Sequence, residues 1–234
     1  IRSVHLGQTA RPDPRLSVPT PTWQRLDESR RQAITDAAEA EFAANGFSGG
    51  SLNVIARDAG VAKGSLFQYF TDKADFYVYL SELASNRIRS YMEVLISEQD
   101  WTGDFWGSFE NLLQVWTDYF IDNPIDKALT AAVNLEPDAS ARIAVRSAVN
   151  HHYLDVLRPL LESAAEDGWI RSDADIDAGL SLLLMIMPHL ALAPGNPGVD
   201  PVLGLDSDSD EVRREAVHRL LLMFRQALEP AAAG

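Results

Sequence analysis

Five side chains within the first hundred residues could carry recognition chemistry, because they share the outer arc of one short predicted helix. That helix runs from near Lys63 to Phe70, with Leu66 and Phe70 four residues apart and facing inward. Exposed polar side chains on such a helix can hydrogen-bond to base edges in the major groove of DNA. The residues left on the outer arc are Lys63, Ser65, Phe67, Gln68 and Tyr69.

A second short helix and a glycine turn precede this helix and would position it. Ser51 is a natural N-cap, and Gly60 supplies a residue that tolerates the left-handed conformation at the helix end. Helix, turn and helix together are the layout of a helix-turn-helix DNA-binding motif. The apolar face of the first of these helices consists of Leu52, Ile55, Ala56 and Ala59.

A longer helix, predicted over residues 27–45, precedes both and ends at Asn45-Gly46. Its sequence contains an apolar stripe with the helical period, which includes Ile34, Ala38 and Phe42. Three helices of this kind can enclose a small core.

This stretch resembles the N-terminal DNA-binding domain of the TetR family of ligand-controlled transcription regulators. The resemblance covers about residues 30–80, and its strength lies in the order and spacing of many elements rather than in any single one. The rest of the chain resembles the family only in its helical pattern and its length. The matching elements are Ala37-Ala38, Phe42, Asn45-Gly46-Phe47, Ser51, Ile55-Ala56, Ala59-Gly60-Val61, Lys63-Gly64-Ser65-Leu66-Phe67, Tyr69-Phe70 and Lys73.

The resemblance implies two groups of DNA contacts. Base-edge or adjacent contacts would come from Lys63, Ser65 and Gln68, since Gln can pair with adenine and Lys can donate to guanine. Contacts to backbone phosphates would come from Ser51, Tyr69 and Lys73, with Arg57 as a weaker candidate. The competing interpretations are that Lys63 is only a solvated charge and that Ser51 only caps a helix.

Two residues depart from the commonest family pattern. Phe67 stands where Tyr is usual, so a hydroxyl that would reach a phosphate is missing; the alternative role for Phe67 is packing against the following helix. Ala62 stands where Ser is frequent, which removes an N-cap worth about 1 kcal/mol.

The net charge of −14 speaks against DNA binding until the charge is divided by segment. Residues 1–73 hold nine Lys or Arg and eight Asp or Glu, a net of +1, whereas residues 74–234 carry a net of −15. This asymmetry favours the N-terminal end as the DNA-contact surface, although an acidic total is also typical of many soluble proteins. No cysteine is present, so disulfides and thiolate metal sites are excluded.

The predicted fold class is all-α, with three segments. Residues 1–22, rich in Pro and Arg, are expected to form a flexible arm; residues 23–72 a three-helix helix-turn-helix domain; and residues 73–234 a larger helical domain for ligand binding and dimerisation. In the last segment we expect helices over residues 104–122, 125–135, 139–167, 175–193 and 208–228 after a long helix from Lys73. Asp208 is the predicted N-cap of the final helix.

The helices over residues 175–193 and 208–228 are apolar over more than one face, which predicts a four-helix interface between two copies of the chain. The alternative is a central position in a monomeric core. A ligand pocket with aromatic walls is also predicted, with ordinary core packing as the competing role of each residue. The candidate pocket residues are Phe105, Phe109, Trp116, Tyr119, His152, Met185 and His189.

Enzyme signatures are absent from the sequence, and no catalytic residue, metal ligand or cofactor is expected. No apolar stretch approaches the roughly 20 residues that span a bilayer. The resemblance implies a cytoplasmic bacterial homodimer, associated with the nucleoid when bound to a near-palindromic operator and released as a repressor by a small-molecule effector. The alternative is a helical small-molecule-binding protein or enzyme whose N-terminal helices do not read DNA.

Overall fold

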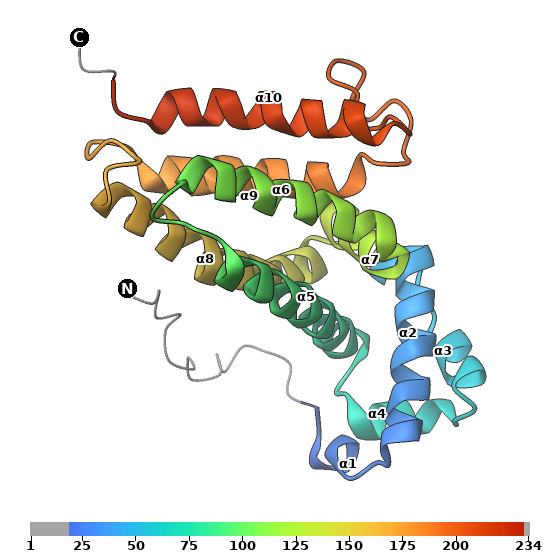
Figure 1. The fold of residues 1–234 in the computed structure, drawn as a ribbon. Helices are drawn as coiled ribbons and strands as arrows, with labels where there is room; N and C mark the ends of the chain where they lie inside the picture. Colours follow the sequence, from blue (N-terminus) through green and yellow to red (C-terminus); the bar gives the residue numbers. More distant parts are fainter. Residues whose placement is uncertain (1–18, 232–234) are drawn as a thin grey trace. The chain divides into compact units, whose positions relative to one another are not determined.

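The computed structural model describes residues 19–231, and within this range all regular structure is helical, as predicted (Figure 1). The helices are α1 (Pro21–Gln24), α2 (Glu28–Gly49), α3 (Leu52–Asp58), α4 (Lys63–Tyr69), α5 (Lys73–Glu98), α6 (Phe105–Asp122), α7 (Pro124–Leu135), α8 (Ala139–Glu166), α9 (Ile176–Leu192) and α10 (Asp210–Leu228).

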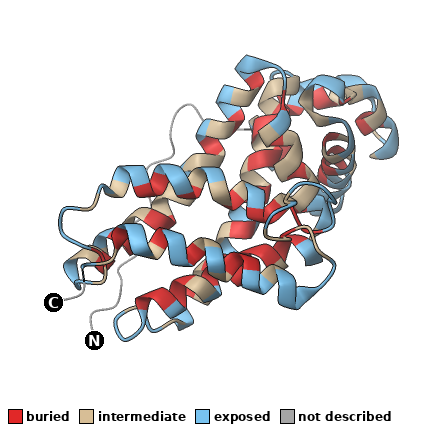
Figure 2. Ribbon diagram, turned by 90° about the horizontal axis from the view of Figure 1, so that it is seen from above, coloured by how far each residue is buried: buried red, intermediate tan, exposed pale blue. Residues whose placement is uncertain are grey.

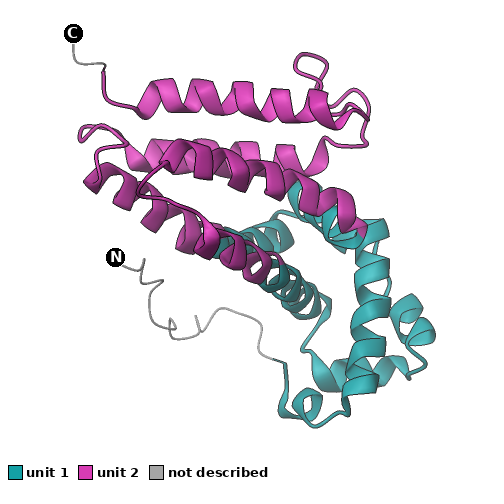
Figure 3. Ribbon diagram, in the orientation of Figure 1, with its two compact units in different colours: residues 1–87, 125–152 teal, residues 88–124, 153–234 magenta. Residues whose placement is uncertain are grey.

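The chain forms two compact units, coloured separately in Figure 3. Of the described residues, unit 1 takes 19–87 and 125–152, and unit 2 takes 88–124 and 153–231. Helices α5 and α8 each contribute residues to both units. Each unit has its own hydrophobic core.

The core of unit 1 is rich in aromatic rings that come from separate helices. Phe70, just after α4, stacks on Phe76 of α5 with ring centroids 4.1 Å apart. Phe42 of α2 meets Tyr77 of α5 edge-on, with centroids 5.0 Å apart. Offset and edge-on aromatic pairs stabilise a core beyond the area they bury. These contacts hold the end of α4, and separately α2, against α5.

The helix ends in this region follow the signals in the sequence. Asp27 caps α2 by accepting a hydrogen bond from the N–H of Arg30, and the Ser51 hydroxyl accepts from the N–H of Val54 at the start of α3. Gly46 (φ +62°) breaks the end of α2, and Gly60 (φ +65°) follows α3. The predicted boundaries at Asp27, Ser51 and Gly60 are confirmed, whereas α2 continues beyond the kink at Gly46 to Gly49.

The first described helix, α1, begins at Pro21, within the segment predicted to be an arm, while residues 1–18 of that arm lie outside the described range. Thr20, which precedes α1, donates its N–H to the carbonyl of Tyr69 at 3.0 Å and its hydroxyl to the carbonyl of Gln68 at 2.5 Å. These carbonyls belong to the last turn of α4, where they have no partner within the helix. Thr20 therefore ties α1 to the C-terminal end of α4.

Unit 2 buries the aromatic face of α6 against α9 and α10. Trp116 of α6 donates its indole N–H to the carbonyl of Met187 in α9, at 2.9 Å. Phe109 of α6 lies 6.1 Å from Phe224 of α10, ring centroid to centroid. Figure 2 marks these inward faces as buried and the opposite helix faces as exposed.

The N-cap predicted for the last helix is wrong by one residue. Ser209, not Asp208, caps α10, and its hydroxyl accepts from the N–H of Val212 at 3.4 Å. Both residue types are good caps. The preceding loop determines which of them meets the helix start, with Ser209 N–H donating to the Ser207 hydroxyl at 3.1 Å.

Candidate nucleic-acid interface

The outward face of α4 is formed by positions with the spacing of one helical arc. Lys63, Gly64, Phe67 and Gln68 are exposed, whereas Leu66 and Tyr69 are buried. Positions i, i+1, i+4 and i+5 lie on the same side of an α-helix, so these four exposed residues form a continuous surface. Ala62 occupies the N-cap and makes no side-chain cap, as its residue type predicts.

Tyr69 does not lie on this outer arc, and that part of the sequence prediction is wrong. Its side chain is 5% exposed, with its ring centroid 5.7 Å from that of Trp23 in α1. The physical reason is that α1, a helix absent from the prediction, covers this side of α4. Ser65 is intermediate in exposure, between the buried and outward sides.

Phe67 does lie on the outer arc, with 49% of its surface exposed. It is not among the residues that form or cover the core of unit 1. Its ring is thus not part of that core, and packing of its covered side against the following helix stays a prediction. An aromatic side chain directed to solvent from this helix is available for a partner molecule.

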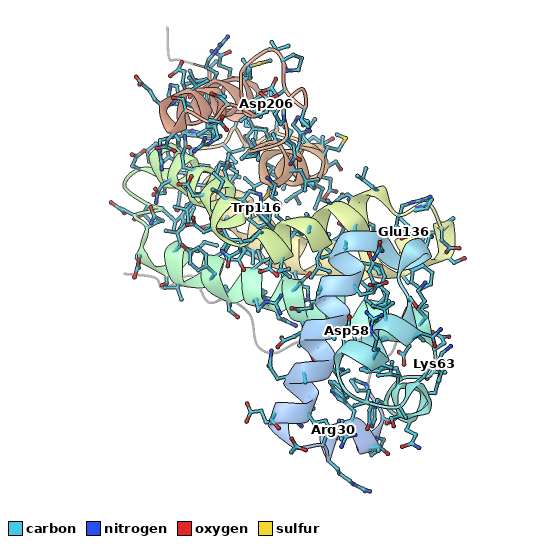
Figure 4. The ribbon with its side chains drawn as sticks, turned by 90° about the vertical axis from the view of Figure 1, so that its right-hand side faces the viewer. Arg30, Asp58, Lys63, Trp116, Glu136 and Asp206 are labelled. Carbon is cyan, nitrogen blue, oxygen red and sulfur yellow. The ribbon has the colours of Figure 1, made fainter. Side chains whose placement is uncertain are left out.

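The basic residues near this face differ in whether an acidic side chain pairs with them. In the part of the chain that the structure describes, no acidic group pairs with Lys63, which α4 directs outward (Figure 4). Arg57 of α3 pairs with Asp58, Nε to Oδ1 at 2.7 Å, and this hydrogen bond raises the pKa of Arg57 and lowers that of Asp58. Asp58 thus offsets the charge that Arg57 would offer to a phosphate.

Two of the predicted phosphate contacts also have structural partners. Ser51 donates its N–H to Oε1 of Glu41 at 2.9 Å, in addition to capping α3. The Lys73 ammonium lies 4.7 Å from the centroid of the Phe47 ring, within the range of a cation–π contact.

Glu136, in the connection between α7 and α8, organises the turn between α2 and α3 and was not singled out from the sequence. The residue is 2% exposed, yet its Oε2 accepts the N–H groups of Phe47 at 2.9 Å and Ser48 at 3.2 Å. Its Oε1 accepts the N–H of Asp138 at 3.0 Å and the Ser48 hydroxyl. Figure 4 shows Glu136 beside the end of α2.

Burial would raise the pKa of Glu136, but the hydrogen bonds from Ser48, Asp138 and Phe47 outweigh it and hold the pKa below its ordinary value. A carboxylate that keeps its charge while buried is well suited to hold a backbone turn. The available sequence signal was an acidic residue between the helices predicted over residues 125–135 and 139–167.

Arg87 of α5 is a second organising residue that was not predicted. Its guanidinium donates to Oε1 of Glu39 in α2 at 2.7 Å and to Oδ1 of Asp126 in α7 at 2.5 Å. Burial opposes the charge of Arg87, but these two hydrogen bonds raise its pKa above the ordinary value. The available signal was an acidic residue, Glu39, at a position that shares a helix face with Thr35, four residues earlier. Both residues are buried in α2.

The residues predicted to line a ligand pocket fall into three groups. Phe105, Phe109, Trp116 and Tyr119 are brought together in the core of unit 2. Met185 and His189 are exposed on α9. His152 belongs to unit 1, where its Nε2 lies 2.8 Å from Oε2 of Glu82.

Residues 19–231 contain no group of three or more His, Asp or Glu side chains placed to hold a metal ion. None of the helices described for this chain is both long enough and apolar enough to cross a lipid bilayer.

A short exposed helix, α4, held by a glycine turn against a capped helix, α3, defines a helix-turn-helix DNA-binding protein. Residues 34–80 match the model of the bacterial regulatory proteins of the tetR family. These residues therefore form a DNA-binding domain of the TetR type, and the chain is a DNA-binding transcriptional regulator.

Known proteins extend the similarity beyond the DNA-binding domain. A fatty acid metabolism regulator protein of Bacillus subtilis (strain 168) is 28% identical over 146 residues, which cover 61% of this chain and 72% of that protein. A TetR family transcriptional regulator from Chloroflexus aurantiacus J-10-FL has a similar fold, with a TM-score of 0.62 and 23% identity over 91% of this chain and 99% of that one.

The transcriptional regulator FadR from Bacillus subtilis, solved in complex with stearoyl-CoA, is similar with a TM-score of 0.63 and 20% identity. The similarity covers 84% of this chain and 98% of that chain. At these identities the two solved structures support the fold alone.

Proposed function

We propose that the protein is a repressor that binds a near-palindromic DNA operator as a homodimer and is released by a small-molecule effector. The observation that carries this proposal is the exposed arc of α4, with Lys63 and Gln68 directed outward from a helix-turn-helix. A dimer would place two such helices in successive major grooves, about 34 to 36 Å apart. The operator would then share the two-fold symmetry of the protein.

The dimer interface that we propose uses α9 and α10. Leu182 and Met185 are exposed on one side of α9, three residues apart, and Leu222 and Met223 are exposed on α10. Exposed apolar residues of this size are a typical feature of surfaces that a partner covers. Two copies related by a two-fold axis would bury them in a four-helix contact.

For the effector we propose a molecule with a long apolar chain, bound in unit 2. The aromatic core that contains Phe105, Phe109 and Trp116 offers the matching surface. The name of the Bacillus subtilis relative and the stearoyl-CoA in the FadR complex support an acyl chain. The net charge of −15 over residues 74–234 disfavours a phosphate-rich headgroup, so the acyl chain and the CoA moiety are to be tested separately.

An effector that binds better to one conformation of the dimer than to another shifts the population of the DNA-binding form. Helix α5 carries residues of both units and is the proposed path of this coupling. We further propose that the protein acts on DNA in the bacterial cytoplasm, at the nucleoid, and that it has no enzymatic activity of its own.

The test is selection of duplexes from a random pool at low salt, followed by release assays on the selected operator. Selection of an inverted repeat supports the proposal, and failure to select any duplex contradicts it. Lys63→Ala should weaken binding and reduce the salt dependence, whereas Arg171→Ala, an exposed change in unit 2, should leave both unchanged. Release by stearoyl-CoA or stearate, but not by CoA alone, would support an acyl effector.

A further inference from the structure

An apolar spot interrupts the polar surface of α4. Of the residues described ahead of Tyr91, Phe67 is the one large apolar side chain that is exposed. It projects from the middle of the DNA-reading helix, between the positions of Lys63 and Gln68. Phenylalanine carries no hydrogen-bond donor, so its ring cannot bind a phosphate in the way that a tyrosine hydroxyl does.

Gly64 lies three residues before Phe67, hence beside it on the helix surface. A Cβ atom added at Gly64 would meet nothing within 4 Å, and Gly64 is not among the glycines with positive φ. The protein itself therefore has both the room and the backbone conformation for a side chain at this position. Alanine would stabilise the helix relative to glycine, so this glycine is not explained by the fold.

A bare backbone at an exposed position allows a partner molecule to approach closely. We infer that Gly64 and Phe67 together form a contact for the 5-methyl group of a thymine in the major groove. This inference rests on DNA binding by α4. Beyond DNA binding itself, the inference names the base that this part of α4 selects, thymine, and the group that it recognises, the 5-methyl group.

Thymine is favoured by the chemistry of the surface. Its methyl group is the apolar feature that bases present in the major groove, and phenylalanine is among the side chains that contact it. Gly64 lets the helix come near enough for the ring of Phe67 to cover the methyl group. Lys63 and Gln68 flank the spot and remain available for polar base edges.

The first experiment replaces each thymine of the selected operator, in both half-sites, with deoxyuridine, which lacks only the methyl group. At the contacted position, removing the methyl group from one half-site should lower wild-type affinity about fourfold, because the burial of one methyl group is lost. Two half-sites together should give about a fifteenfold loss. Phe67→Ala should bind the thymine and uracil operators equally, whereas the matched control Gln68→Ala should weaken binding yet keep the discrimination.

The second experiment uses Gly64→Ala. Its urea unfolding midpoint should equal or exceed that of the wild type, because the added methyl meets no protein atom and favours the helix. Its operator affinity should fall at least tenfold because the added Cβ separates the helix from the bases. Wild-type affinity in this variant would contradict the close approach.

The outcomes separate the inference from the function on which it rests. One outcome is that the wild type binds an operator and yet loses no more affinity than Phe67→Ala at any uracil position. In that case the thymine contact is wrong and DNA binding stands. If no duplex is bound, both fail. If Phe67→Ala changes the sedimentation of the free protein but not thymine discrimination, the ring contacts a second copy of the chain and the inference is overturned.

Discussion

The carboxylate of Glu136 accepts a hydrogen bond at 2.9 Å from the backbone N–H of Phe47, which lies 89 residues earlier in the chain. Gly46, with φ +62°, turns this N–H and that of Ser48 toward the carboxylate. A Cβ at Gly46 would lie 3.4 Å from Oε2 of Glu136, an ordinary van der Waals contact, so the positive φ is what favours glycine here. The turn that leads into the helix-turn-helix is thus held by one buried carboxylate from the α7–α8 connection.

Replacing Glu136 with Gln should lower the free energy of unfolding by about 2 kcal/mol, because a buried donor is left without an acceptor. The carboxylate accepts four hydrogen bonds, whereas an amide presents its NH2 group to part of the same donor set. Urea denaturation followed by circular dichroism measures the change. Glu166→Gln, an exposed change on α8, is the control and should have no measurable effect.

Glu136 should also make stability depend on pH. Its pKa in the folded protein lies below the ordinary value of 4.5, so the unfolded chain binds its proton more tightly. The stabilisation is therefore complete above the unfolded pKa and is lost as the pH falls through the folded pKa. The difference in unfolding free energy between wild type and Glu136→Gln should shrink from pH 6 toward acid; a constant difference would exclude the carboxylate as its source.

Arg87→Lys should destabilise unit 1 by about 1 to 2 kcal/mol, as one ammonium cannot reproduce the two directed hydrogen bonds of the guanidinium. Arg87 holds Glu39, a largely buried carboxylate whose pKa is raised by burial. Thermal unfolding of both proteins at the same salt concentration measures the loss. Arg158→Lys is the matched control: its partners Asp177 and Glu162 are exposed, so a loss as large as that of Arg87→Lys would refute the role of burial.

Gly60→Ala should destabilise the protein by about 1 kcal/mol through backbone strain alone. Gly60 has φ +65°, where a side chain is disfavoured, and an added Cβ would meet nothing within 4 Å. The comparison is Gly64→Ala, which also meets nothing but has no positive φ. Opposite signs in urea denaturation would confirm that conformation separates the two glycines; equal effects would refute it.

The features of unit 1 that were predicted correctly are those set by neighbours in the sequence. Ser51 as an N-cap, Gly60 as a stop and the inward pair of Leu66 and Phe70 depend on residues within one or two turns. The N-cap of α10 was misplaced because Asp208 and Ser209 are both good caps, and a local rule does not decide between adjacent ones.

The features that were missed depend on contacts between distant segments. Tyr69 is buried because Trp23, from a four-residue helix with no periodic pattern, lies against it. The role of Glu136 depends on a turn 89 residues away. No periodicity or capping signal encodes such a contact, since only the folded chain brings the two partners together.

One charged substitution should disrupt the proposed dimer interface. Met185 is 64% exposed, so Met185→Glu should leave the fold of the monomer intact while placing two carboxylates at a two-fold interface. Sedimentation velocity should report a shift from dimer to monomer, and operator affinity should fall more than a hundredfold because one half-site is engaged at a time. Val202→Glu, a change at a still more exposed position in the loop between α9 and α10, should leave the dimer unchanged. A Met185→Glu protein that remains dimeric would show that α9 does not form the interface.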